Sequence, residues 1–179
     1  MNIDQFWNLV GASRRGFRSD HADGNMERQV EALRELLSKI PPNEVREFDD
    51  QMHSLLIEAY TWDLWGAAEL LARGHCSDDF FTDFRSWLIS MGRSRFEEAL
   101  VDPDSLAGAA FLPGVEGVFF EEFQHVAADV FEEMTGQEIE AYTESYPDHP
   151  RGSMWWRTVD DLRERYPRIW DRLKKERTD

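Results

Sequence analysis

Apolar side chains recur at helical spacing along most of this chain of 179 residues, and that period restricts the possible folds more than any other feature. In the clearest stretch, the apolar side chains step by four, three, four and three residues: Met26, Val30, Leu33, Leu37 and Ile40. There is no sustained alternation of period two, and no Asn-Gly or Asp-Gly pair stands between β-branched segments. The sequence therefore predicts an all-α fold.

Start and stop signals divide the chain into about seven to nine expected helices. Pro41-Pro42 ends one helix and can open the next, because proline is tolerated in a first helical turn. Ser77 is a good N-cap for a helix whose first turn carries two acids. Six of the expected helices have apolar stripes over residues 3–10, 26–40, 45–59, 81–91, 96–100 and 119–134, and three more are expected at residues 62–72, 159–166 and 168–175.

A single domain is expected, because the chain has the usual length of one and no linker is long enough to divide it. We predict an irregular helical bundle over residues 1–179, in which residues 137–179 form a less regular tail with two short helices. The core should contain apolar side chains that follow the helical period. These are Phe6, Leu33, Leu37, Phe48, Leu55, Trp65, Phe84, Leu88, Phe123 and Val130.

The composition excludes several classes of protein. The net charge is −16, with 36 acids against 20 bases, so nucleic-acid backbones and anionic membranes are poor partners. The single cysteine excludes an intramolecular disulfide and a Cys-rich zinc site. No apolar run reaches the ~20 residues that span a bilayer, and the N-terminal stretch lacks the pattern of a signal peptide. These observations predict a cytoplasmic protein.

The acidic residues are concentrated in one part of the chain. Residues 97–149 contain 14 acids and neither lysine nor arginine, whereas residues 151–179 carry nine bases and six acids. The acidic segment could pair with the basic tail, with another subunit or with a basic protein partner. It could equally be a solvated surface that keeps the protein soluble by repulsion. The oligomeric state does not follow from this pattern.

Motifs for metal, cofactor or covalent chemistry are weak. Glu122-x-x-His125 has the spacing of helical di-iron sites, and Asp50-x-x-His53 is a poorer copy. Glu122 and His125 lie off the apolar stripe of their helix, so we expect them to face solvent and to bind no metal. The sequence has no nucleophile elbow and no phosphate-binding glycine loop. Cys76 fits a buried structural thiol, and we predict neither a catalytic residue nor a cofactor.

One region mixes tryptophan, aspartate and arginine more densely than the rest of the chain. It lies where the start of the 62–72 helix should meet the turns at 76–79 and 92–93. The candidate ligand-binding residues are Trp62, Asp63, Trp65, Asp78, Asp79, Arg85 and Arg93. The tryptophans could form stacking walls, the aspartates could accept hydrogen bonds, and the arginines could bind an anion. The same residues could instead form a buried ion-pair network that only specifies packing.

Three blocks in the middle of the chain carry a family resemblance. They are Tyr60-Thr61-Trp62-Asp63-Leu64-Trp65-Gly66-Ala67-Ala68, then Cys76-Ser77-Asp78-Asp79-Phe80 with Phe84-Arg85 and Trp87-Leu88-Ile89, and finally Gly92-Arg93 with Glu97, Ala99-Leu100 and 102–106. Together with Phe6-Trp7 and Glu121-Glu122-Phe123, they resemble the bacterial family named domain of unknown function 4240, over roughly residues 1–135. The resemblance implies an α-helical domain without an established activity. Some longer relatives carry the label molybdate metabolism regulator.

Two classes of function remain open at this point. The first is a non-catalytic protein-interaction module with a regulatory or inhibitory role, for which the acidic segment would steer a basic partner and aromatic residues would anchor it. The second is a small ligand-binding domain or enzyme that uses the Asp/Arg/Trp cluster. A flat acidic face with exposed Phe or Trp would favour the first class. A deep polar pocket with convergent carboxylates would favour the second.

Overall fold

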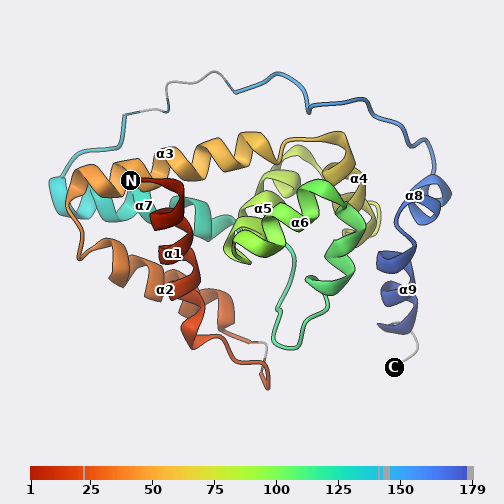
Figure 1. Cartoon of the computed structure of the whole chain (residues 1–179), viewed down its shortest axis with the longest axis horizontal. Coiled ribbons are helices and arrows are strands. Elements are labelled where there is room, and N and C mark those ends of the chain that lie inside the picture. The colour runs from red at the N-terminus through yellow and green to blue at the C-terminus, as the bar shows by residue number, and fades with distance from the viewer. Residues whose placement is uncertain (22, 141, 143–145, 177–179) are drawn as a thin grey trace.

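The computed structural model describes residues 1–21, 23–140, 142 and 146–176. These residues form a bundle of nine α-helices and two short 3-10 helices without a sheet, as Figure 1 shows, so the predicted all-α fold is confirmed. The α-helices are α1 (Ile3–Ser13), α2 (Asn25–Leu37), α3 (Pro42–Glu58), α4 (Trp62–Leu71), α5 (Asp78–Ser90), α6 (Arg93–Val101), α7 (Glu121–Thr135), α8 (Val159–Arg165) and α9 (Pro167–Glu176). The 3-10 helices are η1 (Arg14–Gly16) and η2 (Pro103–Gly108).

Local capping groups set where several helices begin. The side chain of Thr61 accepts a hydrogen bond from the amide of Leu64 at the start of α4. Ser77 accepts one from the amide of Phe80 at the start of α5, as the sequence predicted. These contacts satisfy amides that have no partner within the helix. The two caps therefore fix the entry points of the helices that carry the Trp/Asp/Arg region.

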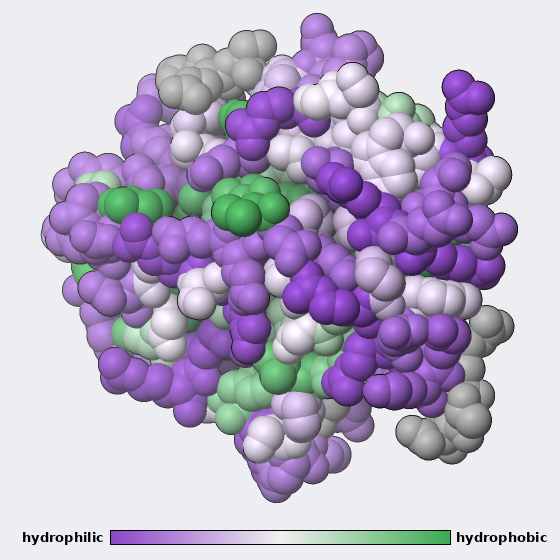
Figure 2. Space-filling model, turned by 45° about the vertical axis from the view of Figure 1, so that its right-hand side comes forward, coloured by the Kyte–Doolittle hydropathy of each residue, from purple (hydrophilic) through white to green (hydrophobic). Residues whose placement is uncertain are grey.

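The core is continuous and is centred on α3, α5 and α7, which pack against one another. Nine of the ten predicted core side chains are buried, and the tenth, Trp65, is half-buried. Trp65 is only half-buried because α4 lies at the edge of this core, where it also packs against α8 and α9. The surface is largely hydrophilic, and hydrophobic side chains form separate patches on the face in Figure 2.

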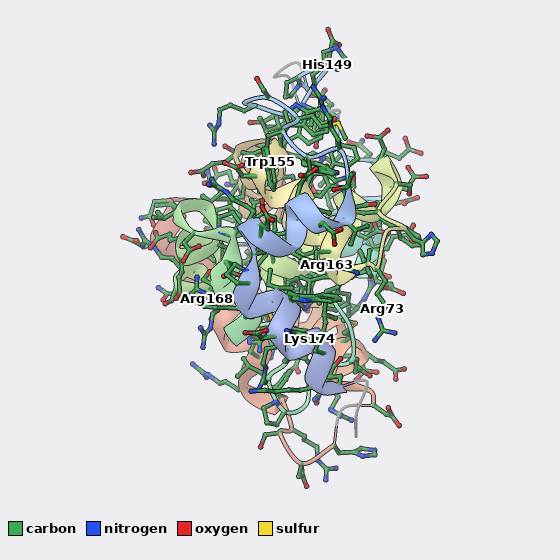
Figure 3. The ribbon with its side chains drawn as sticks, turned by 90° about the vertical axis from the view of Figure 1, so that its right-hand side faces the viewer. Arg73, His149, Trp155, Arg163, Arg168 and Lys174 are labelled. Carbon is green, nitrogen blue, oxygen red and sulfur yellow. The ribbon has the colours of Figure 1, made fainter. Side chains whose placement is uncertain are left out.

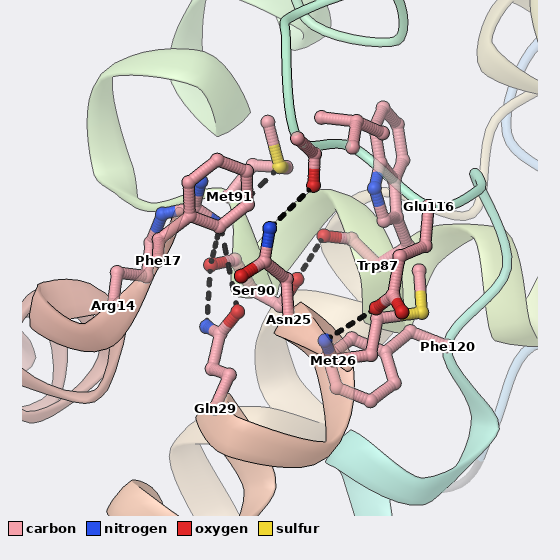
Figure 4. Close-up of a pocket in the computed structure, with 12 residues that line it drawn as sticks. Arg14, Phe17, Asn25, Met26, Gln29, Trp87, Ser90, Met91, Glu116 and Phe120 are labelled. Atoms are coloured by element: carbon pink, nitrogen blue, oxygen red, sulfur yellow. Dashed lines mark hydrogen bonds between the residues drawn. The ribbon is translucent and has the colours of Figure 1, made fainter. Parts of the chain in front are cut away.

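The predicted apolar stripe of α2 packs against the core, but in its N-terminal half the buried face also includes polar residues that the sequence did not indicate. Asn25 and Gln29 are buried there, whereas Met26 and Val30 are only half-buried. Buried polar groups need partners, and the Asn25 amide donates to the Gly114 carbonyl at 2.8 Å. Gln29 likewise donates to the carbonyl of residue 90 at 2.9 Å, as Figure 4 shows. The space between these groups is about 10 Å³, room for about one water molecule, so this junction is a packed polar joint.

The C-terminal segment, described continuously from residue 146 to residue 176, includes α8 and α9, which pack against α4 (Figure 1). Its main chain is fastened where α3 meets α4: the amide of Arg151 donates to the Tyr60 carbonyl at 2.8 Å, and the amide of Trp62 donates to the Arg151 carbonyl at 3.1 Å. Leu162 and Tyr166 are buried beneath α8 and α9. This segment therefore extends the core beyond α7.

Candidate functional site

The aromatic half of the predicted Trp/Asp/Arg cluster is brought together by α4 and α5. Trp62 and Trp65 stack with ring centroids 5.3 Å apart, and Trp65 stacks on Phe81 at 4.6 Å. The indole N–H of Trp65 donates to the Cys76 carbonyl at 3.2 Å. Trp65 has a stacking partner in α4 and another in α5. Trp65 thus joins α4 to the start of α5, and its ring is already occupied by protein neighbours.

The three aspartates of the cluster lie on the outside of the molecule. Asp63, Asp78 and Asp79 are all exposed. Asp63 accepts a hydrogen bond from the indole of Trp155 at 2.9 Å, which ties it to the C-terminal segment. Among the described residues, none of the three forms an ion pair with an arginine. The hypothesis of a buried Asp–Arg network is therefore wrong, because these carboxylates remain in water, where ionisation has no desolvation penalty.

Arg85 is buried to 1% exposure without a carboxylate partner among the described residues. Its guanidinium lies 4.6 Å from the ring centre of Tyr60 and 4.9 Å from that of Phe81. It also donates to the Tyr146 hydroxyl, which comes from the C-terminal segment. Desolvation by burial lowers the pKa of Arg85 from its ordinary value. The aromatic rings and neutral oxygens supply the partners that the charge requires.

The position of Arg85 explains why it needs no carboxylate. Its Nη1 donates at 2.6 Å to the carbonyl of Leu56, which lies in the last turn of α3. The amide of Tyr60, four residues after Leu56, donates to the Ile57 carbonyl instead, so this acceptor is left open by the helix. A guanidinium at the negative end of a helix dipole is stabilising. Arg85 therefore acts as a buried cap for α3, which is an architectural role.

Arg93 is separate from the aromatic cluster. It is exposed at the start of α6, where it pairs with Asp4 and Glu97, each at 2.6 Å. These contacts join α6 to α1. Of the seven predicted site residues, the structure brings Trp62 and Trp65 together, and Phe81 connects Trp65 to Arg85. Arg93 contacts a different part of the bundle.

Cys76 lies at the inner end of the same cluster. It is buried, and desolvation, followed by the charge of Glu69, raises its pKa to about 12. A thiol with so high a pKa is not a thiolate at neutral pH, so it is a poor nucleophile and a poor metal ligand. The buried environment agrees with the structural role that the sequence indicated.

A groove that the sequence did not indicate lies between α3, α7 and residues 138–140 and 142. It has a volume of about 430 Å³. The described residues that line it include five carboxylates and two histidines but no lysine or arginine. Its lining consists of Asp49, His53, Leu56, Gln124, His125, Ala128, Asp129, Glu132, Glu138, Ile139, Glu140 and Tyr142. We call this feature the acidic groove.

The carboxylates of the acidic groove differ in how far they are neutralised. Asp129 pairs with Arg34 at 3.0 Å, and Glu140 pairs with Arg46 at 3.3 Å, both arginines lying outside the groove lining. Glu132 and Glu138 are exposed and have no ion pair among the described residues. The groove therefore keeps uncompensated negative charge beside an apolar floor that includes Leu56, Ala128 and Ile139.

His53 occupies one wall of the acidic groove. Its Nδ1 lies 3.3 Å from the carboxylate of Asp49, which is buried, and its ring stacks on Tyr142 with centroids 5.3 Å apart. The hydrogen bond to Asp49 is the main reason why the pKa of His53 is raised. Protonation of this imidazole would reduce the negative charge of the groove, so the groove should be most acidic above the pKa of His53.

We expect His53 to titrate above the ordinary histidine pKa of about 6.5, and Asp49→Asn to bring the value down toward it. Because the folded-state pKa is raised, the stability contributed by the protonated pair is complete below about pH 6.5 and disappears as the pH rises through the folded-state pKa. Histidine resonances followed by NMR from pH 5 to 9 would measure both values. A His53 pKa at or below the ordinary value of about 6.5 would contradict the expectation.

The sequence motifs included both histidines of this groove, but they combined each with a carboxylate that does not line it. The motifs joined His53 to Asp50 and His125 to Glu122, whereas Asp49 and Asp129 line the groove. Polar residues three and four positions apart along α7 share one face beside its apolar stripe, and this pattern could have indicated the groove. His125 is exposed, as expected. Among the described residues, no group of three His, Cys, Asp or Glu is arranged to hold a metal ion.

The family described as "Protein of unknown function (DUF4240)" matches residues 1–133. The chain belongs to this family. The match reaches from α1 into the last turns of α7, so it includes both helices of the acidic groove, while residues 138–142, α8 and α9 lie beyond it. Comparison with curated proteins and with solved structures gave no match. Within the described residues, no helix is both long enough and apolar enough to cross a membrane.

Proposed function

We propose that this member of the DUF4240 family is a non-catalytic interaction module that binds a basic segment of a partner protein in the acidic groove. The observation that carries the proposal is the lining of the groove. It combines five carboxylates with the stacked rings of His53 and Tyr142, and it contains no lysine or arginine among the described residues. Most of that lining comes from the acidic part of the chain, residues 97–149.

The chemistry of the groove suits arginine or lysine side chains. Glu132 and Glu138 would accept charge-assisted hydrogen bonds, which are stronger than neutral ones. The rings of His53 and Tyr142 lie nearly parallel, at 14°, and form an aromatic wall for a guanidinium or an alkyl chain. The net charge of −16 would steer a basic partner toward the molecule and raise the association rate. By occupying the basic segment of its partner, the protein would regulate or inhibit that partner.

The alternative of a ligand-binding site or enzyme at the Trp/Asp/Arg cluster has less support. Arg85 already donates to Leu56, Thr82 and Tyr146, and Trp65 already stacks on Trp62 and Phe81. The carboxylates of that cluster are exposed, whereas a carboxyl group that does acid–base work is typically held in a desolvated environment.

Binding of an octa-arginine peptide, measured by calorimetry, tests the proposal. We expect saturable 1:1 binding that weakens as salt rises from 50 to 300 mM, because the charges are partly exposed. The double substitution Glu132→Gln/Glu138→Gln should weaken binding about tenfold, which corresponds to two partly screened charge pairs of ~0.7 kcal/mol each. The folded state should be retained, because both side chains are exposed.

The matched control is Glu31→Gln/Glu164→Gln, which removes the same charge from exposed positions outside the groove. Its affinity for the peptide should stay within about twofold of the unsubstituted protein. Equal weakening by both double variants would show that the peptide responds only to net charge, and the proposed groove function would then be rejected.

A further inference from the structure

A second cavity, unrelated to the acidic groove, lies between α4 and the pair α8–α9. Its volume is about 250 Å³. Apolar side chains from all three helices form most of its wall: Leu70, Val159, Leu162, Trp170 and Leu173. The remaining lining residues are Glu69, Arg73, Gly74 and Arg163. Ligand cavities typically combine an apolar wall with a few polar groups in this way.

Cationic groups gather at this cavity. The guanidinium of Arg163 lies 4.1 Å from the ring centre of Trp170, and the Lys174 ammonium lies 5.8 Å from the same ring. Figure 3 looks onto this face and shows Arg73, Arg163 and Lys174 around α8 and α9. The acid of the lining, Glu69, is engaged, because its Oε2 accepts the Cys76 amide at 3.0 Å. Positively charged groups therefore lie around the Trp170 side of the cavity, although the protein as a whole is strongly acidic.

Arg163 and Lys174 already have carboxylate partners, and Arg73 does not. Arg163 pairs with Asp160 at 2.6 Å, and Lys174 pairs with Asp171 at 2.7 Å. The exposed side chain of Arg73 has no ion pair or hydrogen bond among the described residues. Arg73 is therefore the cation of the lining that is available to a ligand.

The backbone at Arg73 supplies an independent observation. Arg73 has φ of 56°, and it is the one non-glycine residue with positive φ in the described part of the chain. It follows the C-cap of α4, a position where glycine is normally favoured because a side chain is strained there. Strained residues of this kind concentrate at ligand sites. The chain places an arginine at the mouth of the cavity where local conformation favours glycine.

We propose that this cavity binds a small amphipathic monocarboxylate, with its apolar part between Leu70, Leu162 and Trp170 and its carboxylate at Arg73. A dry cavity of about 150 Å³ accepts benzene, so about 250 Å³ has room for a ligand of about ten non-hydrogen atoms. Octanoate has this size. The site uses none of the residues of the acidic groove, so the two proposals stand or fall separately.

Titration with octanoate, followed by calorimetry and by amide NMR shifts, tests the site. We expect saturable 1:1 binding of octanoate, and binding of octylamine at least tenfold weaker, because the amine would meet Arg73 and Arg163. Arg73→Gly should weaken octanoate binding three- to tenfold, while the melting temperature rises by about 2 °C through relief of the positive φ. A rise in stability together with a loss of affinity separates a ligand role from a structural one.

Two further variants complete the test. Val159→Trp, at a half-exposed lining position, should block the cavity and abolish octanoate binding while the protein stays folded. Arg15→Ala removes one exposed arginine elsewhere and should leave the affinity unchanged. Absence of saturable binding, equal affinity for octanoate and octylamine, or equal weakening by Arg15→Ala and Arg73→Gly would each overturn the proposal.

Discussion

Replacing Arg85 by methionine should lower the free energy of unfolding by about 3 kcal/mol. The substitution keeps most of the volume but leaves the Leu56 carbonyl without its donor at the end of α3. An unsatisfied buried acceptor costs about 1–3 kcal/mol, and the contacts of the guanidinium with Tyr60 and Phe81 are lost in addition. Relief of the buried charge offsets part of this loss. Urea unfolding followed by circular dichroism would measure the difference.

The matched control is Arg93→Met, which removes an arginine with two ion pairs on the surface. Exposed pairs contribute little, so the unfolding free energy should hardly change. The sequence alone gave these two arginines the same role, and the structure separates them by burial. Equal stability of Arg85→Met and the unsubstituted protein would contradict the capping role of Arg85.

Replacing Gly66 by leucine should destabilise the protein by about 3 kcal/mol and loosen the C-terminal segment. Gly66 lies inside α4, and a Cβ atom there would come within 3.1 Å of the Tyr166 hydroxyl, 3.2 Å of Trp156 and 3.3 Å of Leu162. All three neighbours belong to the segment that follows α7. Amide hydrogen exchange should therefore lose protection first in α8 and α9, while α3, α5 and α7 keep theirs.

Gly11→Leu provides the control for the change of residue type. Gly11 is an exposed glycine in α1, and a Cβ atom there would meet nothing within 4 Å. Leucine is the better helix former, so this variant should be more stable by about 0.5–1 kcal/mol. Uniform loss of protection across all helices in Gly66→Leu would argue against a separable docking of α8 and α9.

Helical periodicity was enough to predict the all-α fold class, because the spacing of apolar residues within each helix indicates which face of that helix is buried. It did not predict that Asn25 and Gln29 are buried beside the apolar stripe of α2. Their partners, Gly114 and the carbonyl of residue 90, are far away in the sequence, so local spacing contains no sign of them. Buried polar joints of this kind require knowledge of tertiary contacts.

In the candidate site, too, local spacing predicted only the contacts within one helix. Stacking of Trp62 on Trp65 follows from their i, i+3 spacing within one helix. The separation of Arg85 from Arg93 depends on how α5 and α6 pack, which spacing does not reveal. The acidic groove requires α3, α7 and residues 138–140 and 142 to meet, and the high content of acids in residues 97–149 was its signal in the sequence.

Mapping of amide NMR shifts on addition of octa-arginine tests the central claim most directly. The account predicts that the largest changes fall on residues that line the acidic groove, among them His53, His125, Glu132 and Ile139. The same residues should respond least in Glu132→Gln/Glu138→Gln. Changes spread over exposed acids throughout the molecule, or centred on α4 and the Trp62–Trp65 pair, would contradict the assignment of the groove as the binding site.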